Sequence, residues 1–136
     1  MADRLTPERR SDLMRRVRGK DTAPEMVVRR LAHAAGFRFR LHRKDLPGKP
    51  DLCFHSRRKA IFVHGCFWHG HGCKIGRLPK SRLEFWGPKI ARNRERDGVA
   101  VAGLAALGWK VLTVWQCETK DTESLRQRVV EFLEEP

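Results

Sequence analysis

Two short apolar runs limit the fold of this chain more than any other feature. Residues 60–64 read AIFVH and residues 109–115 read WKVLTVW, so both are largely apolar on each face of an extended strand. Strands of this kind lie inside sheets that are covered on both faces. The rest of the chain must therefore supply helices for two outer layers, which indicates a three-layer α/β domain.

The periodicity of the remaining residues supplies those helices and completes the sheet. Thr22 and Glu25 have the spacing of a helix N-terminus, Gly36 is a stop signal, and Pro88 can open a long helix. We expect one domain over residues 1–136, with a small mixed central sheet flanked by helices. The predicted order is two helices (5–17, 21–36), three strands (37–42, 51–54, 60–64), a helix (88–108), a strand (109–115) and a helix (121–135).

Basic residues outnumber acidic residues by a wide margin. The chain carries 29 Lys and Arg against 16 Asp and Glu, a formal net charge of +13. This excess favours a polyanionic partner, most simply nucleic acid, and the alternative is a basic protein without such a partner. Residues 1–20 are expected to form a basic helix that contacts DNA.

The cysteines and the absence of long apolar segments bear on where the protein works. No run has the length of a membrane span or the composition of a secretory signal. The cysteines share their neighbourhood with histidines, which favours metal binding over disulfides, and Cys53, inside a predicted strand, is assigned to the core. We expect a monomer of the bacterial cytoplasm that is associated with the nucleoid when bound to DNA and has no membrane partner.

Residues 64–73, HGCFWHGHGC, hold three histidines and two cysteines in ten positions. Cys66, His71 and Cys73 lie in this segment, and Cys117 follows the last predicted strand. If the two apolar strands are neighbours, their following loops meet and these residues form a Cys3His set, which suits structural zinc. The alternative is a group of cysteines without metal, since free cysteines are often buried.

Carboxylates and the remaining histidines outline a second centre. Asp51 enters a predicted strand next to the one that ends at His64, which brings its carboxylate near the main chain at Val63. Oxygen ligands suit Mg²⁺, and Glu25 on the second helix can hold a metal-bound water. A nuclease needs such a cation and a base; His69, on a glycine-flanked loop, can be that base while His64 positions the phosphate.

Each of these residues also has a structural interpretation. Glu25 can be the acidic partner of a Thr22 capping box, and Asp51 can simply start a strand after a turn. His64 and His69 can be outer hydrogen-bond partners of the zinc ligands. The residue types alone leave both interpretations open.

Five motifs together carry a resemblance to a known family. They are LMRRVRGKDTAPE (13–25), LPGKPDL (46–52), FVHGCFWHGHGC (62–73), WGPKIARN (86–93) and VLTVWQCE (111–118). On these residues the chain resembles the very short patch repair (Vsr-type) DNA mismatch endonucleases. That family has a variant of the PD-(D/E)xK restriction-endonuclease fold with a structural zinc and a Mg²⁺-dependent nicking site. One departure from the wider fold is that Val63 and His64 replace its second acidic residue and lysine.

The resemblance implies roles for the matching residues. Asp51 would be the principal Mg²⁺ ligand, joined by the backbone oxygen of Val63. His69 would be the general base, assisted by His64 and Glu25 at the phosphate and the metal waters. The implied zinc ligands are Cys66, His71, Cys73 and Cys117.

The family's substrate is a T·G mismatch left when 5-methylcytosine deaminates, which links its action to a cytosine-5 DNA methyltransferase. The enzyme nicks the thymine-containing strand 5′ to the mismatched T, in a specific sequence context. The resemblance implies that Phe67 and Trp68 enter the DNA there, because a mismatch stacks poorly and is unstacked at reduced cost. The alternative for Phe67 and Trp68 is a small apolar cluster around the zinc.

Four further residues complete the implied DNA contacts. By resemblance, Met14 on the first helix would enter from the opposite groove, and Trp86 would extend the aromatic surface. Lys89 and Asn93 lie four residues apart on one helical face, where they can contact base edges near the mismatch.

Two other functions compete with mismatch nicking. A zinc-stabilised nucleic-acid-binding module without catalysis explains the charge, the aromatics and the zinc, but leaves Asp51, His64 and His69 without a joint role. A nuclease with the same core and another target explains all of these features. Mg²⁺-dependent cleavage separates the first alternative from a nuclease, and the choice of duplex tests the second.

Overall fold

The computed structural model describes residues 22–73 and 83–136, so the predicted N-terminal helix and Met14 lie outside the described residues. The element order agrees with the prediction. The elements are α2 (Ala23–Ala34), β1 (Arg40–Leu41), β2 (Leu52–Phe54), the 3-10 helix η1 (His55–Arg57), β3 (Lys59–His64), α3 (Leu83–Ala106), β4 (Lys110–Trp115), the 3-10 helix η2 (Gln116–Lys120) and α4 (Thr122–Glu134).

The strands form one mixed sheet in the order β1-β2-β3-β4. β2 runs antiparallel to both β1 and β3, whereas β3 runs parallel to β4 with His64 opposite Trp115. The condition on which the grouping of Cys66, His71, Cys73 and Cys117 depends, that the two apolar strands are neighbours, is therefore met. Because parallel strands end at the same edge of a sheet, the segments that follow His64 and Trp115 begin side by side.

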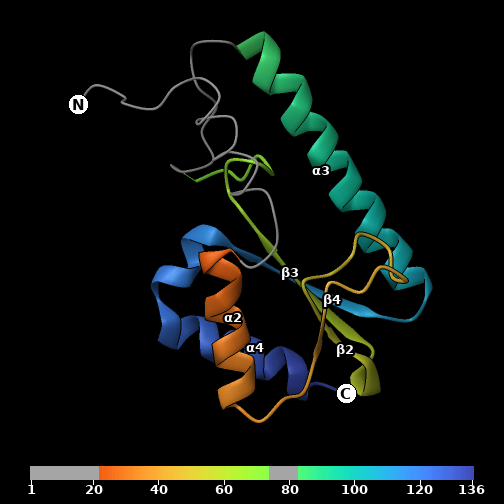
Figure 1. Cartoon of the computed structure of the whole chain (residues 1–136), viewed down its shortest axis with the longest axis vertical. Helices are drawn as coiled ribbons and strands as arrows, with labels where there is room; N and C mark the ends of the chain where they lie inside the picture. The colour runs from red at the N-terminus through yellow and green to blue at the C-terminus, as the bar shows by residue number, and fades with distance from the viewer. Residues whose placement is uncertain (1–21, 74–82) are drawn as a thin grey trace.

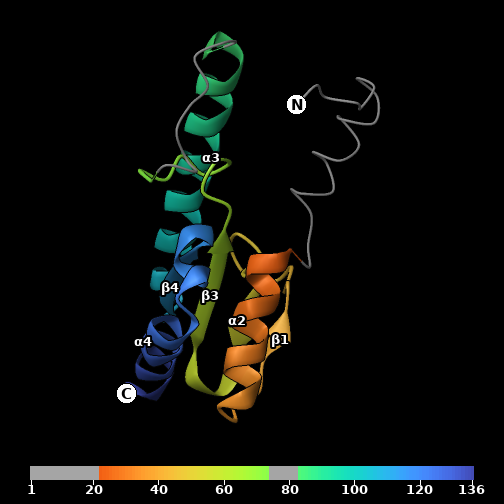
Figure 2. The same ribbon diagram turned by 90° about the vertical axis from the view of Figure 1, so that its left-hand side faces the viewer.

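Helices cover both faces of this sheet. α2 and α4 lie together on one face, and α3 lies on the other (Figures 1 and 2). Side chains along β3 alternate between the two layers, since Ile61 packs with α2 and α4 while Ala60 and Phe62 pack on the α3 side. The predicted three-layer α/β architecture is confirmed.

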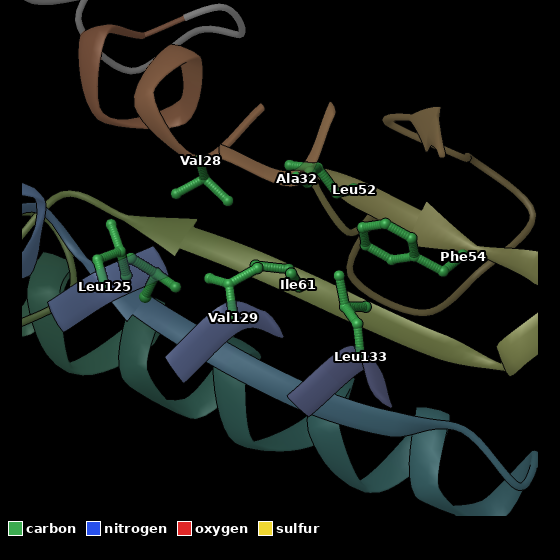
Figure 3. Packing of buried hydrophobic residues seen from close by; sticks show 9 residues of the cluster. Val28, Ala32, Leu52, Phe54, Ile61, Leu125, Val129 and Leu133 are labelled. Atoms are coloured by element: carbon green, nitrogen blue, oxygen red, sulfur yellow. The ribbon is translucent and has the colours of Figure 1, made fainter. Parts of the chain in front are cut away.

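Apolar side chains fill both spaces between the layers. Figure 3 shows the larger cluster, which joins α2 and α4 to the sheet. Burying one Val or Leu side chain contributes roughly 1.5–3 kcal/mol, so this cluster anchors the strands that carry the site. Its members are Val28, Ala32, Leu52, Phe54, Ile61, Val114, Leu125, Val129 and Leu133. The smaller cluster on the α3 side is Leu46, Cys53, Ala60, Phe62, Ala100 and Leu104, so the core position predicted for Cys53 is confirmed.

The prediction that Pro88 opens the long helix is wrong. α3 begins at Leu83 and contains Pro88 in its interior. A proline clashes with the Cβ of a helical residue before it, and Gly87 has no Cβ, which reduces the clash. Trp86 consequently lies on the helix and not on a loop before it. Within the described residues, no helix combines the length and apolar composition needed to cross a bilayer.

Lys59, at the start of β3, is buried although it carries a charged group. Its Nζ donates hydrogen bonds to the main-chain oxygens of Phe132 and Glu135 at the C-terminal end of α4. The last carbonyl groups of a helix lack partners within the helix, and a cation there also meets the negative end of the helix dipole. Lys59 therefore ties the end of α4 to the sheet.

We expect Lys59→Met to lower the free energy of unfolding by about 1.5–3 kcal/mol, because two carbonyl groups lose a charged donor. Urea denaturation followed by circular dichroism measures this change. Lys110→Met is the matched control, since Lys110 donates to the Pro136 carbonyl at an exposed position. Its effect should stay within about 0.5 kcal/mol, and equal losses in both variants would contradict the capping role of Lys59.

Candidate active site and metal centre

A cleft of about 980 Å³ lies beyond the carboxyl ends of β3 and β4. Its walls come from α2, the segment before β2, the loop after β3 and the middle of α3. Ligands of open α/β sheets bind outside the carboxyl ends of the strands, so this is the expected place for a substrate. The predicted site residues that line the cleft are Glu25, Asp51, Val63, His64, Phe67, Trp68, His69 and Asn93.

Asp51 lies where the sequence places it, beside the main chain of Val63. Its Oδ2 accepts a hydrogen bond from the Val63 N–H at 2.7 Å. The N–H and C=O of one residue point to the same side of an extended strand, so the Val63 carbonyl is expected to face this side of β3 as well. A carboxylate and a carbonyl oxygen are the hard ligands that Mg²⁺ prefers.

The Glu25 carboxylate belongs to the same group as Asp51. Glu25 is 2% exposed, forms an ion pair with Arg29 and lies 3.0 Å from Nε2 of His42. Its main-chain N–H donates to Oγ1 of Thr22 at 3.4 Å, so Thr22 caps α2 as predicted. Because the carboxylate contacts Arg29 and His42, it does not complete a capping box, and it stays at the cleft.

The two neighbouring carboxylates repel each other. Burial above all, together with the adjacent Glu25, raises the pKa of Asp51 to about 7, although the Val63 N–H and Arg29 act in the opposite direction. A divalent cation between the carboxylates would offset this repulsion and replace the missing solvation. The charge and chemistry of these oxygens therefore fit Mg²⁺.

His64, His69 and Asp97 form a second group in the cleft. The rings of His64 and His69 stack with their centroids 3.8 Å apart and their planes at 4°. Nδ1 of His69 lies 2.6 Å from a carboxylate oxygen of Asp97 on α3. A carboxylate at Nδ1 keeps the ring proton there and leaves Nε2 to accept one, which is the arrangement of a general base.

The other histidine of this group, His64, is held as a neutral ring. It is 7% exposed, and burial, followed by the neighbouring His69, lowers its pKa to about 4, so the ring is neutral at physiological pH. Among the described residues its Nδ1 has no hydrogen-bond partner. A neutral ring of this kind can donate a hydrogen bond to a phosphate without adding charge.

The structure brings together the four residues that the sequence groups as zinc ligands. One ligand atom each from Cys66, His71, Cys73 and Cys117 lies within 4.8 Å of all the others. The Cys117 N–H donates to Sγ of Cys66 at 3.4 Å, and Sγ of Cys117 lies 3.6 Å from Nδ1 of His71. Three thiols and one imidazole suit a closed tetrahedral zinc site. That they hold zinc stays a prediction.

The surroundings of these thiols also fit a metal. Burial first, and then the neighbouring thiols Cys73 and Cys117, raise the pKa of Cys66 to about 12. Such thiols stay protonated unless a cation displaces their protons, as zinc does. The His71 ring stacks on Trp115 with centroids 4.2 Å apart and planes at 14°, which fixes its orientation from β4.

Phe67, Trp68 and Trp86 form one aromatic cluster. The ring centroids lie 5.1 Å apart for Phe67 and Trp68, 5.1 Å for Phe67 and Trp86, and 5.6 Å for Trp68 and Trp86. Trp68 is 9% exposed, whereas Phe67 and Trp86 are half-buried. The cluster is thus packed like a small core, and it also lines the cleft through Phe67 and Trp68.

Lys89 and Asn93 both contact this aromatic cluster from α3. Nζ of Lys89 lies between 5.5 and 6.0 Å from the ring centroids of Phe85, Trp86 and Trp68. Nδ2 of Asn93 donates to the Trp68 carbonyl at 2.8 Å. Asn93 therefore holds the aromatic loop on α3, and its contact with a base edge stays a prediction.

His42 and Asp97 are site residues that sequence reasoning missed. His42 lies among the basic residues of RLHRKD, and Asp97 ends the charged run NRERD, so both segments resemble solvated surface. Asp97 follows Asn93 by four residues and shares its face of α3. That spacing is the signal that could have found Asp97, whereas His42 had none.

Comparisons of this sequence with known proteins give relatives among DNA endonucleases and nicking enzymes. A family model described as DNA mismatch endonuclease Vsr matches residues 2–75. A relative from Xanthomonas oryzae pv. oryzae, named type II nicking enzyme V.XorIIP, is 61% identical over 134 residues, which cover 98% of each chain. Escherichia coli (strain K12) has a relative named DNA mismatch endonuclease Vsr, 42% identical over 136 residues, which cover 99% of this chain and 87% of the relative. The type II nicking enzyme V.NmeAIP of Neisseria meningitidis is 40% identical over 135 residues, 99% of this chain and 96% of the relative.

Proposed function

Because this chain belongs to the Vsr family of DNA mismatch endonucleases, and is a DNA endonuclease of restriction-endonuclease-like fold, we propose that it nicks DNA 5′ to the T of a T·G mismatch. Deamination of 5-methylcytosine creates that mismatch, so the nick would start very short patch repair. The observation that carries the proposal is one cleft lined by the carboxylates of Asp51 and Glu25 and by His69.

Asp51 and the Val63 carbonyl would hold Mg²⁺, with Glu25 beside its water ligands. The ion, when bound, offsets the charge that develops on the scissile phosphate and promotes ionisation of water. The protein's own contribution is to fix the oxygens in advance. The Val63 N–H orients Asp51, while Arg29 and His42 hold Glu25.

His69 is the proposed general base. Asp97 keeps the ring proton of His69 on Nδ1, so that Nε2 takes a proton from the attacking water. His64 stacks on the same ring and limits its rotation. As a buried neutral group, His64 also provides a hydrogen bond for the phosphate.

We expect Asp97→Asn to lower kcat by about 10²–10⁴-fold, because the amide no longer holds the His69 proton on Nδ1 or stabilises the imidazolium. Single-turnover nicking measures the loss. Glu95→Gln is the matched control, since Glu95 is an exposed acidic residue on the same helix and should keep full activity. Undiminished nicking by Asp97→Asn would refute the proposed pairing of His69 with Asp97.

Phe67 and Trp68 are proposed to enter the DNA beside the mismatch. Asn93 holds the Trp68 carbonyl. The proposed zinc ligands flank the aromatic pair, with Cys66 directly before Phe67 and His71 three residues after Trp68, so little loop entropy remains to be lost on insertion. A wobble pair stacks poorly, which lowers an unstacking cost of a few kcal/mol per step. Trp86 packs against the aromatic pair from α3. Lys89 adds a positive charge that attracts the phosphate backbone of the DNA.

The protein's setting follows from the same chemistry. A cytosine-5 DNA methyltransferase makes the base whose deamination yields the substrate, so we propose that the two enzymes act in one functional sequence. The formal net charge of +13 supports association with DNA. We place the protein in the bacterial cytoplasm and expect it to act as a monomer.

A nuclease with another target is the second candidate function. The relatives from X. oryzae and N. meningitidis are named type II nicking enzymes, and those names mention no mismatch. The same cleft would serve a nick in matched DNA, because catalysis needs only the phosphate, the metal and the base. The two functions differ in the DNA that the enzyme cuts, which is a duplex with a T·G mismatch in the first and matched DNA in the second.

Nicking of supercoiled plasmids that carry a single T·G mismatch, placed in several flanking sequences, tests the proposal. The matched C·G counterpart of each is run beside it, with Mg²⁺ and with EDTA. Open-circular product from the mismatched plasmid alone, and only with Mg²⁺, is the expected result. Equal nicking of both plasmids would favour the second candidate, and no nicking of the T·G plasmid in any flanking sequence would refute the proposal.

A further inference from the structure

We infer that His42 is a positioning residue of the Mg²⁺ site, where it holds the Glu25 carboxylate beside Asp51 and thereby sets the affinity of the site for the ion. This inference rests on the proposed function, because it assigns His42 a part in the same site. The inference is based on three observations: the contacts of His42, its backbone conformation and the burial of Glu25.

His42 contacts both acidic residues of the site. Its Nε2 lies 3.1 Å from Oε1 and 3.0 Å from Oε2 of Glu25, and 3.7 Å from Oδ1 of Asp51. Its main-chain N–H donates to the main-chain oxygen of Asp51 at 3.3 Å. One residue thus fixes the side chain of Glu25 and the backbone of Asp51 relative to each other.

The backbone of His42 adds an independent observation. Its φ is +48°, in the left-handed region that residues other than glycine seldom adopt. β1 ends immediately before it, at the pair of Leu41 with Leu52. Asparagine, aspartate and histidine adopt this region more readily than other residues with a side chain, and backbone conformations of this kind are concentrated at binding sites. The contact with Glu25 gives the histidine a reason to be there.

Glu25 has more than one partner and is buried beside another carboxylate. It is 2% exposed, and Arg29, one turn further along α2, forms an ion pair with its Oε2. Arg29 approaches from the same helix as Glu25, whereas His42 approaches from the strand side and also reaches Asp51. His42 therefore contacts both carboxylates from the strand side, and such partners typically change metal affinity or activity by about 10–100-fold.

Two substitutions that differ by one methylene test the inference. The amide nitrogen of Gln takes nearly the place of the imidazole Nε2, whereas that of Asn takes the place of Nδ1 and falls short of Glu25. Asn also tolerates a positive φ, so His42→Asn should fold. We expect His42→Asn to raise the Mg²⁺ concentration for half-maximal nicking by about tenfold or more, and His42→Gln to stay near wild type.

Three further measurements separate positioning from a general structural effect. KM for T·G duplex at saturating Mg²⁺ and the melting temperature should be unchanged in His42→Asn. His33→Asn, at an exposed histidine of α2, should behave as wild type throughout. Calorimetric titration of the zinc-loaded protein with Mn²⁺ reports metal affinity independently of nicking, and the affinity should fall in His42→Asn alone.

The outcomes distinguish this inference from the proposed function. If the wild type fails to nick T·G DNA and Mn²⁺ affinity still falls only in His42→Asn, the function is wrong and the role of His42 stands. Unchanged metal dependence in His42→Asn, by both readouts, overturns the role of His42 even if the wild type nicks. Equal losses in His42→Asn and His42→Gln also overturn it, because they would make the imidazole a direct metal ligand.

Discussion

Asp51→Asn is expected to abolish nicking in a protein that still folds, keeps its zinc and binds mismatched DNA. The amide keeps an oxygen for the Val63 N–H but removes the charge that holds Mg²⁺. Loss of several kcal/mol of transition-state stabilisation corresponds to roughly 10³-fold or more in kcat. Burial and the adjacent Glu25 already disfavour the Asp51 charge and raise its pKa to about 7, so the melting temperature should not fall.

Four measurements on Asp51→Asn check this expectation: single-turnover nicking, fluorescence anisotropy with T·G duplex, zinc content and thermal unfolding. Asp45→Asn is the matched control, since Asp45 is an exposed aspartate that pairs with Arg43 on the same segment. It should nick at the wild-type rate. Persistent nicking by Asp51→Asn, or loss of its fold or zinc, would contradict the assignment of Asp51 as the principal Mg²⁺ ligand.

Purified protein is expected to contain stoichiometric zinc, and Cys66→Ser is expected to lose it together with much of its stability. Cys66 is fully buried, so the substitution removes a ligand and leaves a hydroxyl among three donors that no longer hold a metal. Loss of a structural metal belongs to the largest effects of single substitutions, and we expect a decrease of at least about 3 kcal/mol in the free energy of unfolding.

Elemental analysis and denaturant unfolding, each with and without prior chelation, measure the two effects of Cys66→Ser. Cys53→Ala is the matched control, because Cys53 is equally buried but belongs to the core on the α3 side. It should keep full zinc content and lose only the packing energy of its side chain. Wild type purified without zinc, or unchanged zinc in Cys66→Ser, would remove the metal assignment.

Much of the fold was predictable because its central strands are apolar on both faces. That property requires strands covered on both faces, which predicts the three layers, whereas the parallel pairing of β3 with β4 entered the prediction only as a condition that the structure meets. The zinc grouping follows from the same topology, since Cys66 and Cys117 each lie two residues beyond the paired ends His64 and Trp115. The strand register and the equal spacing of the two cysteines from the strand ends therefore account for this part of the site.

The two missed residues, His42 and Asp97, reach the site through local backbone geometry, which the residue pattern indicates for Asp97 but not for His42. His42 reaches Glu25 from a left-handed turn after a two-residue strand, and no periodicity marks such a turn. Asp97 reaches His69 only through the rotational phase of α3, a helix whose start the sequence placed at Pro88 and not at Leu83. Glu25 was predicted in part. The sequence identified it as a candidate site residue but did not decide whether it belongs to a helix cap or to the catalytic site.

The strand and position of the nick in an end-labelled duplex with one T·G mismatch test the central claim most directly. Each strand is labelled in turn, and the matched C·G duplex and a chelator control are run in parallel. The proposed function predicts one Mg²⁺-dependent product, cut in the T-containing strand immediately 5′ to the mismatched T. Equal cleavage of the matched duplex, cleavage of the G-containing strand, or a nick that survives the chelator would contradict it.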